Sequence, residues 1–140
     1  MKDRQILELS KYRVQQAHET LHEAEILFRE GAWRGAVNRS YYAMFYAALA
    51  LVTVRSYSTS KHAGVIAFFD REFIKTGIFP KELSRNFHLA FDQRQVQDYG
   101  EFTVINDTLA QETLANAITF VDAIETYLIG TVFPKFQEAE

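Results

Sequence analysis

The chain has no cysteine, two prolines and six glycines among its 140 residues. Without cysteine, disulfides, thiolate metal sites and thiol nucleophiles are excluded. Met1 is followed by Lys2, Asp3 and Arg4 with no apolar run, so no signal peptide is expected. The longest nearly uncharged stretch, residues 40–54, is short for a membrane span and carries three tyrosines. These absences predict a soluble, cytoplasmic protein with no membrane segment.

What is present is typical of one globular domain. Hydrophobic residues make up 48% of the chain and charged residues 24%, which argues against disorder. The net charge of −3 is uneven: residues 1–100 hold 14 of the 15 basic and 11 of the 18 acidic residues, which leaves one base and seven acids for the rest. A nucleic-acid surface on residues 1–100 is therefore compatible with the acidic pI of 5.8. Ordinary solvated helix faces account for the same charges.

Helical periodicity runs through every long segment, and no strand pattern is found. Five helices are predicted, over about residues 4–29, 34–54, 61–74, 81–98 and 107–128. Thr59 or Ser60 is expected to cap the third helix, and Asn106 or Asp107 the fifth. The pattern predicts an all-α up-and-down bundle over residues 1–130. Residues 131–140 are expected to be a loose C-terminal tail.

The most conspicuous short pattern is H-E-T-L-H at residues 18–22. On a helix, His18 and His22 lie one turn apart and could bind zinc, with Glu19 as the general base. Glu23 follows where such zinc helices usually have an apolar residue, and no third histidine continues the motif. We therefore interpret the pattern as a solvated helix face and predict no metal site, with a zinc hydrolase as the weakest alternative.

A polar stripe crosses the otherwise apolar second helix. Arg39, Tyr42 and Tyr46 lie at steps of three and four residues, with Asn38 beside them. A buried arginine needs water, a carboxylate or a ligand. The stripe is either a packing surface with one ion pair or the wall of a groove, where arginine meets phosphate and tyrosines stack on bases.

The fourth helix ends with Arg94 and Asp98 on its inner face. Arginine four residues before an acid is the weaker order for an ion pair, and an acid near a helix C-terminus opposes the helix dipole. The two residues form either a functional site or an ion pair that closes the core. At the start of the third helix, Lys61 and His62 follow hydroxyl residues, an arrangement that suits a phosphate and equally an ordinary helix cap.

Together these segments resemble a known family. Residues 38–47 read N-R-S-Y-Y-A-M-F-Y-A and match the N-R-x-Y-Y-A-x-F-Y-A signature of small prokaryotic HEPN-domain proteins. The S-K-H opening at 60–62 and the blocks at 69–77 and 94–99 follow in the order found in that family. The resemblance covers roughly residues 5–128, and several ordered motifs are more specific than one short pattern.

The resemblance implies a compact helical bundle that commonly forms homodimers, with Arg94 facing a composite cleft and no cofactor. Many members are metal-independent RNases that act as toxins and are paired with a small nucleotidyltransferase as antitoxin. Others are non-catalytic nucleotide-binding or RNA-binding companions. In the RNase branch an arginine is followed a few residues later by a histidine; the arginine stabilises the phosphorane charge and the histidine transfers the proton.

This chain departs from the RNase motif, because Tyr99 stands at the position aligned with the histidine. Tyrosine is a poor proton acceptor at neutral pH. His62 follows an arginine at a similar spacing in the wrong helix, although it could enter the cleft in three dimensions. Whether the chain is an enzyme is left open by this degenerate motif.

The sequence thus predicts a HEPN-family protein that binds a nucleotide or RNA and forms one component of a pair with a nucleotidyltransferase. RNase activity would use Arg94, with Asp98, Tyr99 or His62 transferring the proton. The predicted binding residues are Asn38, Arg39, Tyr42, Tyr46, Lys61 and His62. The alternative is a non-catalytic binding or assembly subunit that presents substrate to the nucleotidyltransferase.

Overall fold

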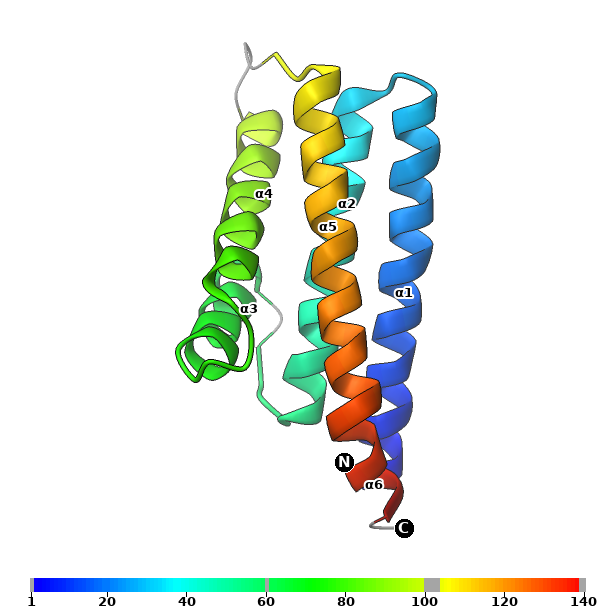
Figure 1. Ribbon diagram of the computed structural model, residues 1–140, viewed down its shortest axis with the longest axis vertical. Helices are drawn as coiled ribbons and strands as arrows, with labels where there is room; N and C mark the ends of the chain where they lie inside the picture. Colours follow the sequence, from blue (N-terminus) through cyan, green and yellow to red (C-terminus); the bar gives the residue numbers. More distant parts are fainter. Residues whose placement is uncertain (1, 60, 100–103, 139–140) are drawn as a thin grey trace.

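A computed structural model describes residues 2–59, 61–99 and 104–138, with side chains for 2–59, 61–94 and 104–136. These residues form helices and connections, with no strand among them, as an all-α bundle requires. The elements in chain order are α1 (Asp3–Arg29), α2 (Trp33–Val54), α3 (His62–Phe69), the π-helix η1 (Asp70–Ile74), α4 (Lys81–Tyr99), α5 (Asp107–Tyr127), the π-helix η2 (Leu128–Val132) and α6 (Phe133–Glu138). Helices α1, α2, α4 and α5 run up and down alternately (Figure 1). The predicted fold class is confirmed.

The first two helices form an antiparallel pair (Figure 1). Gly31 ends α1 with a positive φ of 76°, a conformation that glycine adopts without a steric penalty. Farther along the pair, the buried hydroxyl of Ser10 donates a hydrogen bond to the Ala50 carbonyl at 3.0 Å. The α1–α2 turn therefore lies where the sequence predicted it.

The third helix begins later than predicted and changes type. Its N-cap is Lys61, whose side chain makes no capping hydrogen bond, so the prediction of a Thr59 cap is wrong; Ser60 lies outside the described residues. The Thr59 hydroxyl instead fills the place that a Cβ atom on Gly64 would occupy. Beyond Phe69 the helix continues as the π-helix η1, which buries Phe73.

A cluster of phenylalanine rings joins α3, α4 and α5. The Phe120 ring lies 5.1 Å from that of Phe69 and 4.8 Å from that of Phe87, between ring centroids. All three side chains are fully buried. Burial of large aromatic rings dominates the energy of a small core, so this cluster fixes how α3 and α4 lie against α5.

The fifth helix begins as predicted and extends further than predicted. The Asn106 side chain accepts a hydrogen bond from the Leu109 N–H at 2.9 Å, which confirms the predicted cap. Beyond residue 130 the chain continues through η2 into α6, so the prediction of a loose tail is wrong over residues 131–138. The reason is hydrophobic, because Phe133 is 6% exposed and Phe136 also packs against the core.

Residues 107–136 form one helical stretch that is long and apolar enough to cross a membrane by length and composition alone. Its apolar side chains are not arranged for lipid. Ala117, Phe120, Val121 and Ile124 are buried within the bundle, whereas Gln111, Glu112 and Asp122 are exposed. One buried face and one polar face are typical of a core helix in a soluble bundle.

Candidate phosphate-binding site

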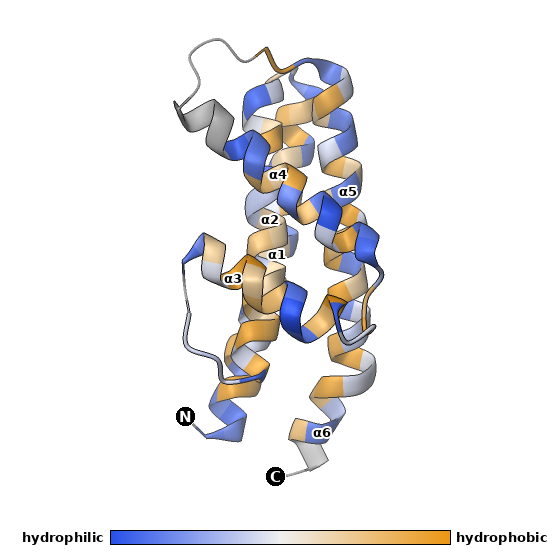
Figure 2. Ribbon diagram, turned by 90° about the vertical axis from the view of Figure 1, so that its left-hand side faces the viewer, coloured by the Kyte–Doolittle hydropathy of each residue, from blue (hydrophilic) through white to orange (hydrophobic). Residues whose placement is uncertain are grey.

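Three elements distant in sequence meet at one place. The middle of α2 contributes Tyr41 and Tyr42, the first residue of α3 contributes His62, and the end of α4 contributes Arg94. Figure 2 shows α3 and α4 on the side of the molecule that faces the viewer, and both helices pack against α2. The polar groups that the sequence placed in separate motifs thus share one site.

His62 is held by aromatic rings on α2. Its Nδ1 atom lies 2.6 Å from the Tyr41 hydroxyl oxygen, and its ring stacks on Phe45 with 4.3 Å between centroids. Tyr42 meets the same imidazole edge-on at 5.7 Å, and Phe91 of α4 stacks at 6.3 Å. These contacts fix the imidazole in position beside the start of α3.

The Tyr41 contact also determines which imidazole nitrogen carries the proton. Tyr41 is fully buried, and burial raises the pKa of its phenol, so its hydroxyl is protonated and needs an acceptor. We infer that it donates to Nδ1 of His62. A neutral imidazole that accepts at Nδ1 carries its proton at Nε2. His62 therefore offers an N–H donor at Nε2.

Arg94 lies against both tyrosines of α2. Its guanidinium carbon is 5.8 Å from the Tyr41 ring centroid and 5.4 Å from that of Tyr42. The pKa of His62 is lowered from its usual value of 6.5, mainly by burial and to a smaller extent by the positive charge of Arg94. At neutral pH the imidazole is therefore uncharged, and the positive charge beside Tyr41 and Tyr42 is that of Arg94.

A second guanidinium lies on the same tyrosine. The Arg39 carbon is 4.9 Å from the Tyr42 ring centroid, and Arg39 donates two hydrogen bonds to the Asn38 side-chain oxygen, at 3.1 and 2.9 Å. Tyr42 therefore contacts both Arg39 and Arg94. Arg39, Arg94 and the neutral N–H donor of His62 all contact Tyr42, and the positive charge of the two arginines favours an anion as ligand.

The other predicted residues are placed as follows. Tyr46 is half-buried next to Tyr42, with 6.1 Å between ring centroids. Lys61 is exposed and lines a hollow of about 570 Å³ together with Tyr57, Ser58 and Thr59. The α4 backbone is helical through Asp98 and Tyr99, and the side chains of these two residues lie outside the described part.

Tyr41 is the site residue that the sequence analysis missed. The polar stripe was traced from Arg39 at steps of three and four residues, and Tyr41 falls off that stripe. The sequence analysis included Tyr41 only as one letter of the signature match at residues 38–47. The missing signal was the buried hydroxyl, which must find a polar partner outside its own helix.

The H-E-x-x-H pattern forms no metal centre in the described residues. His18 Nε2 pairs with the Glu125 carboxylate on α5 at 3.0 Å, while Glu19 and His22 are exposed. Among the residues described, no three histidine, aspartate or glutamate side chains gather in a way that would hold a metal ion. His18 and His22 therefore do not form a common site, and the His18–Glu125 pair links α1 to α5.

Comparison with known proteins places the chain in a family. The family model described as HEPN domain matches residues 10–127, so the chain belongs to the HEPN family. A UPF0332 protein of Thermotoga maritima is 40% identical over 115 residues, which cover 82% of this chain and 87% of that protein.

Two relatives from Methanocaldococcus jannaschii each carry the name "putative toxin". One is 33% identical over 117 residues, covering 84% of this chain and 80% of its own length. The other is 34% identical over 112 residues, covering 80% of this chain and 83% of its own length. The resemblance found from the sequence motifs is therefore confirmed, and two of the relatives carry toxin names.

Proposed function

We propose that this HEPN protein binds the phosphate of an RNA strand or nucleotide between Arg39 and Arg94. The observation that carries the proposal is Tyr42, which contacts both guanidinium groups. Guanidinium groups form paired hydrogen bonds with phosphate oxygens. The Nε2–H group of His62 is a third donor for the same phosphate. Tyr46 extends the aromatic surface on which a base would stack.

A second candidate function is metal-independent cleavage of that RNA. The observation that favours it is His62, because His62 and Arg94 both lie against Tyr41 and Tyr42, so the site has an imidazole that the α4 motif lacks. In the reaction the 2′-oxygen forms a bond to the adjacent phosphorus, the bond from phosphorus to the 5′-oxygen breaks, and a cyclic phosphate and a 5′-hydroxyl result. Arg94 would stabilise the charge on the phosphorane.

The protonation state of His62 decides what it can do in this reaction. As a neutral imidazole with its proton at Nε2 it would hydrogen-bond to a phosphate oxygen; protonating the leaving 5′-oxygen would require the imidazolium, which forms only below the lowered pKa of His62. The proton of the 2′-hydroxyl would pass to Asp98 or Tyr99. Without such an acceptor the same site binds and does not cut, which is the alternative of a subunit that presents substrate to a partner.

The deciding experiment is incubation of the protein with cellular RNA in EDTA, together with an anisotropy measurement of RNA binding. Arg94→Ala is expected to lose binding and any cleavage without a change in helicity or melting temperature. Arg85→Ala is the matched control, because it removes an exposed arginine from the same helix. Wild-type cleavage that Arg94→Ala abolishes supports the RNase, and binding without cleavage supports the presenting subunit. Binding that Arg94→Ala leaves intact rejects both.

The wider setting belongs to the same proposal. We place the protein in the cytoplasm, as a homodimer and as one component of a pair with a nucleotidyltransferase. The relatives named as toxins support a toxin-like role. Light scattering tests the dimer, and co-purification with a co-expressed small nucleotidyltransferase tests the pair. A monomer that captures no such protein contradicts this part.

A further inference from the structure

The connection between α2 and α3 carries an aromatic side chain on its outer surface. The connection runs along the outside of the bundle from the end of α2 to the start of α3 (Figure 2). Within it the Tyr57 ring is stacked on the buried Phe68 ring, with 4.9 Å between centroids, yet Tyr57 is 45% exposed. One part of the ring is therefore anchored in the core, and much of the rest faces solvent.

Arg71 of η1 lies beside this stack. Its guanidinium carbon is 5.2 Å from the Tyr57 centroid and 5.9 Å from the Phe68 centroid. Together with the 4.9 Å between the rings, these distances form a triangle whose angle at Tyr57 is acute. Phe68 and Arg71 thus do not enclose Tyr57 from both sides, and its outward surface is open to a planar ligand.

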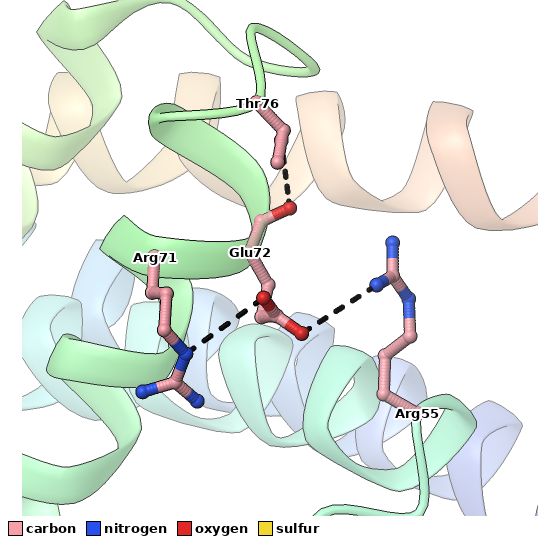
Figure 3. Close-up of polar contacts among 4 residues, drawn as sticks. All are labelled: Arg55, Arg71, Glu72 and Thr76. Atoms are coloured by element: carbon pink, nitrogen blue, oxygen red, sulfur yellow. Dashed lines mark hydrogen bonds and ion pairs between the residues drawn. The ribbon is translucent and has the colours of Figure 1, made fainter.

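The surroundings of Arg71 carry excess positive charge. Figure 3 shows Arg55 and Arg71 reaching the Glu72 carboxylate from opposite sides, at 3.9 and 3.7 Å. Both distances are longer than a hydrogen bond, and all three side chains are at least a third exposed. One acid between two arginines leaves a net charge of +1, and exposed pairs of this kind are weak.

This aromatic and cationic group is joined to the phosphate-binding site through the start of α3. Tyr57, Ser58, Thr59 and Lys61 line one hollow, and the residue that follows Lys61 is His62 of the site itself. The five Cα–Cα steps from Tyr57 to His62 span at most about 17 Å when fully extended. One strand of RNA that has a phosphate at Arg94 can therefore reach Tyr57 along this connection.

We propose that Tyr57, Arg71 and Lys61 form an accessory subsite that stacks a base of single-stranded RNA and contacts the adjacent phosphates. The proposal rests on the function proposed above and adds the class of ligand, a single strand several nucleotides long. Stacking on an exposed aromatic ring requires an unpaired base, because both faces of a base are covered in a duplex. The subsite therefore selects single strands over duplexes and longer strands over dinucleotides.

The test measures the affinity of a dinucleotide and of a single strand of about eight nucleotides, a length typical of such grooves. Tyr57→Ala is expected to weaken binding of the longer strand by about tenfold and to leave the dinucleotide unchanged. Tyr57→Phe retains the ring and is expected to bind like the wild type. The matched control is Tyr12→Ala on α1, since Tyr12 is 55% exposed and also has an arginine beside it.

Two charge variants test the cationic part. Arg71→Ala is expected to reduce the slope of log affinity against log salt by about 0.7 for the longer strand. Glu72→Gln removes the acid between the arginines and is expected to strengthen binding of the longer strand. An unchanged dinucleotide affinity shows in each variant that the fold and the Arg94 site are intact.

The results separate this inference from the proposed function. If Tyr57→Ala binds both strands like the wild type while Arg94→Ala binds neither, the subsite is rejected and the phosphate site stands. If Tyr57→Ala alone weakens the longer strand, the subsite stands and the Arg94 site is rejected. An equal loss for the dinucleotide and the longer strand also rejects the subsite, because an accessory contact cannot affect a ligand too short to reach it.

Discussion

The Tyr41 hydroxyl and Nδ1 of His62 lie 2.6 Å apart, and this contact joins the centre of α2 to the first residue of α3. It connects a fully buried phenol to a half-buried imidazole beside Arg94. Because the phenol keeps its proton, the contact sets the imidazole as a donor at Nε2. The chemistry available at the site therefore depends on a core residue that the ligand does not touch.

Replacing Tyr41 with Phe tests this relationship. Nitrogen chemical shifts of the His62 ring are expected to show a protonated Nε2 and an unprotonated Nδ1 in the wild type, and a mixture of the two tautomers in Tyr41→Phe. The lost hydrogen bond is expected to lower the free energy of unfolding by about 0.5–1.5 kcal/mol. A wild-type spectrum with the proton on Nδ1 contradicts the assignment and makes Nε2 an acceptor.

The pH dependence of stability follows from the lowered pKa of His62. The unfolded chain binds a proton at His62 below about pH 6.5, while the folded chain binds it only at lower pH. Protons therefore favour the unfolded state in this window, and stability is expected to fall as the pH is lowered through 6.5. Above that pH the contribution is fully present.

Urea unfolding between pH 8 and pH 5 measures this effect, with His62→Gln as the reference. The stability difference between the wild type and His62→Gln is expected to shrink on acidification. Contributions from groups other than His62 are common to both proteins and cancel in that difference. A difference that stays constant over the range is the contrary result.

A second polar link positions α4. Asp70, the first residue of η1, accepts a hydrogen bond from the Ser84 hydroxyl at 2.6 Å, and its other oxygen lies 2.6 Å from Nε2 of His88. Asp70→Ala is expected to cost about 1–2 kcal/mol, since both contacts are lost and both partners are partly solvated. Chemical denaturation measures this, with exposed Asp92→Ala on α4 expected to change stability by less than about 0.5 kcal/mol. Equal effects of the two variants mean that Asp70 contributes only its charge.

The C-terminal helix makes a measurable contribution to the core. Phe133→Ala removes a side chain that is 6% exposed and is expected to destabilise the fold by about 3 kcal/mol. Ile129→Ala, in the preceding π-helix, removes a side chain that is 59% exposed and is expected to cost less than about 0.5 kcal/mol. If thermal unfolding shows no difference between the two, α6 does not belong to the cooperative unit.

Much of the fold was predictable because its signals are local. Gly31 ends α1 with its positive φ, and the Asn106 side chain caps α5, and each is recognised from one residue type and its neighbours. The late start of α3 was missed because Thr59 packs against Gly64, a contact that no propensity encodes. The tail was misjudged for a related reason, since Phe133 is apolar in sequence but its burial depends on the rest of the bundle.

The site was predictable residue by residue but not as an arrangement. Arg39, Tyr42 and Arg94 were selected from helix periodicity and from the family signature, and the structure brings them together. Their meeting with His62 depends on how α3 folds back onto α2, which periodicity within one helix cannot show. The roles of these residues in binding or catalysis stay predictions until the variants above are measured.

The distribution of the site over the sequence has a consequence during protein synthesis. The α1–α2 pair can form as soon as residues 3–54 have left the ribosome, because the two helices are consecutive in the chain and are joined by a short connection. Arg94 follows only after a further forty residues, and the Phe120 ring that holds Phe69 and Phe87 together is made later still. A nascent chain is thus largely helical well before it has a complete ligand site. A ligand that needs Arg94 can therefore be bound only by a chain that is nearly complete.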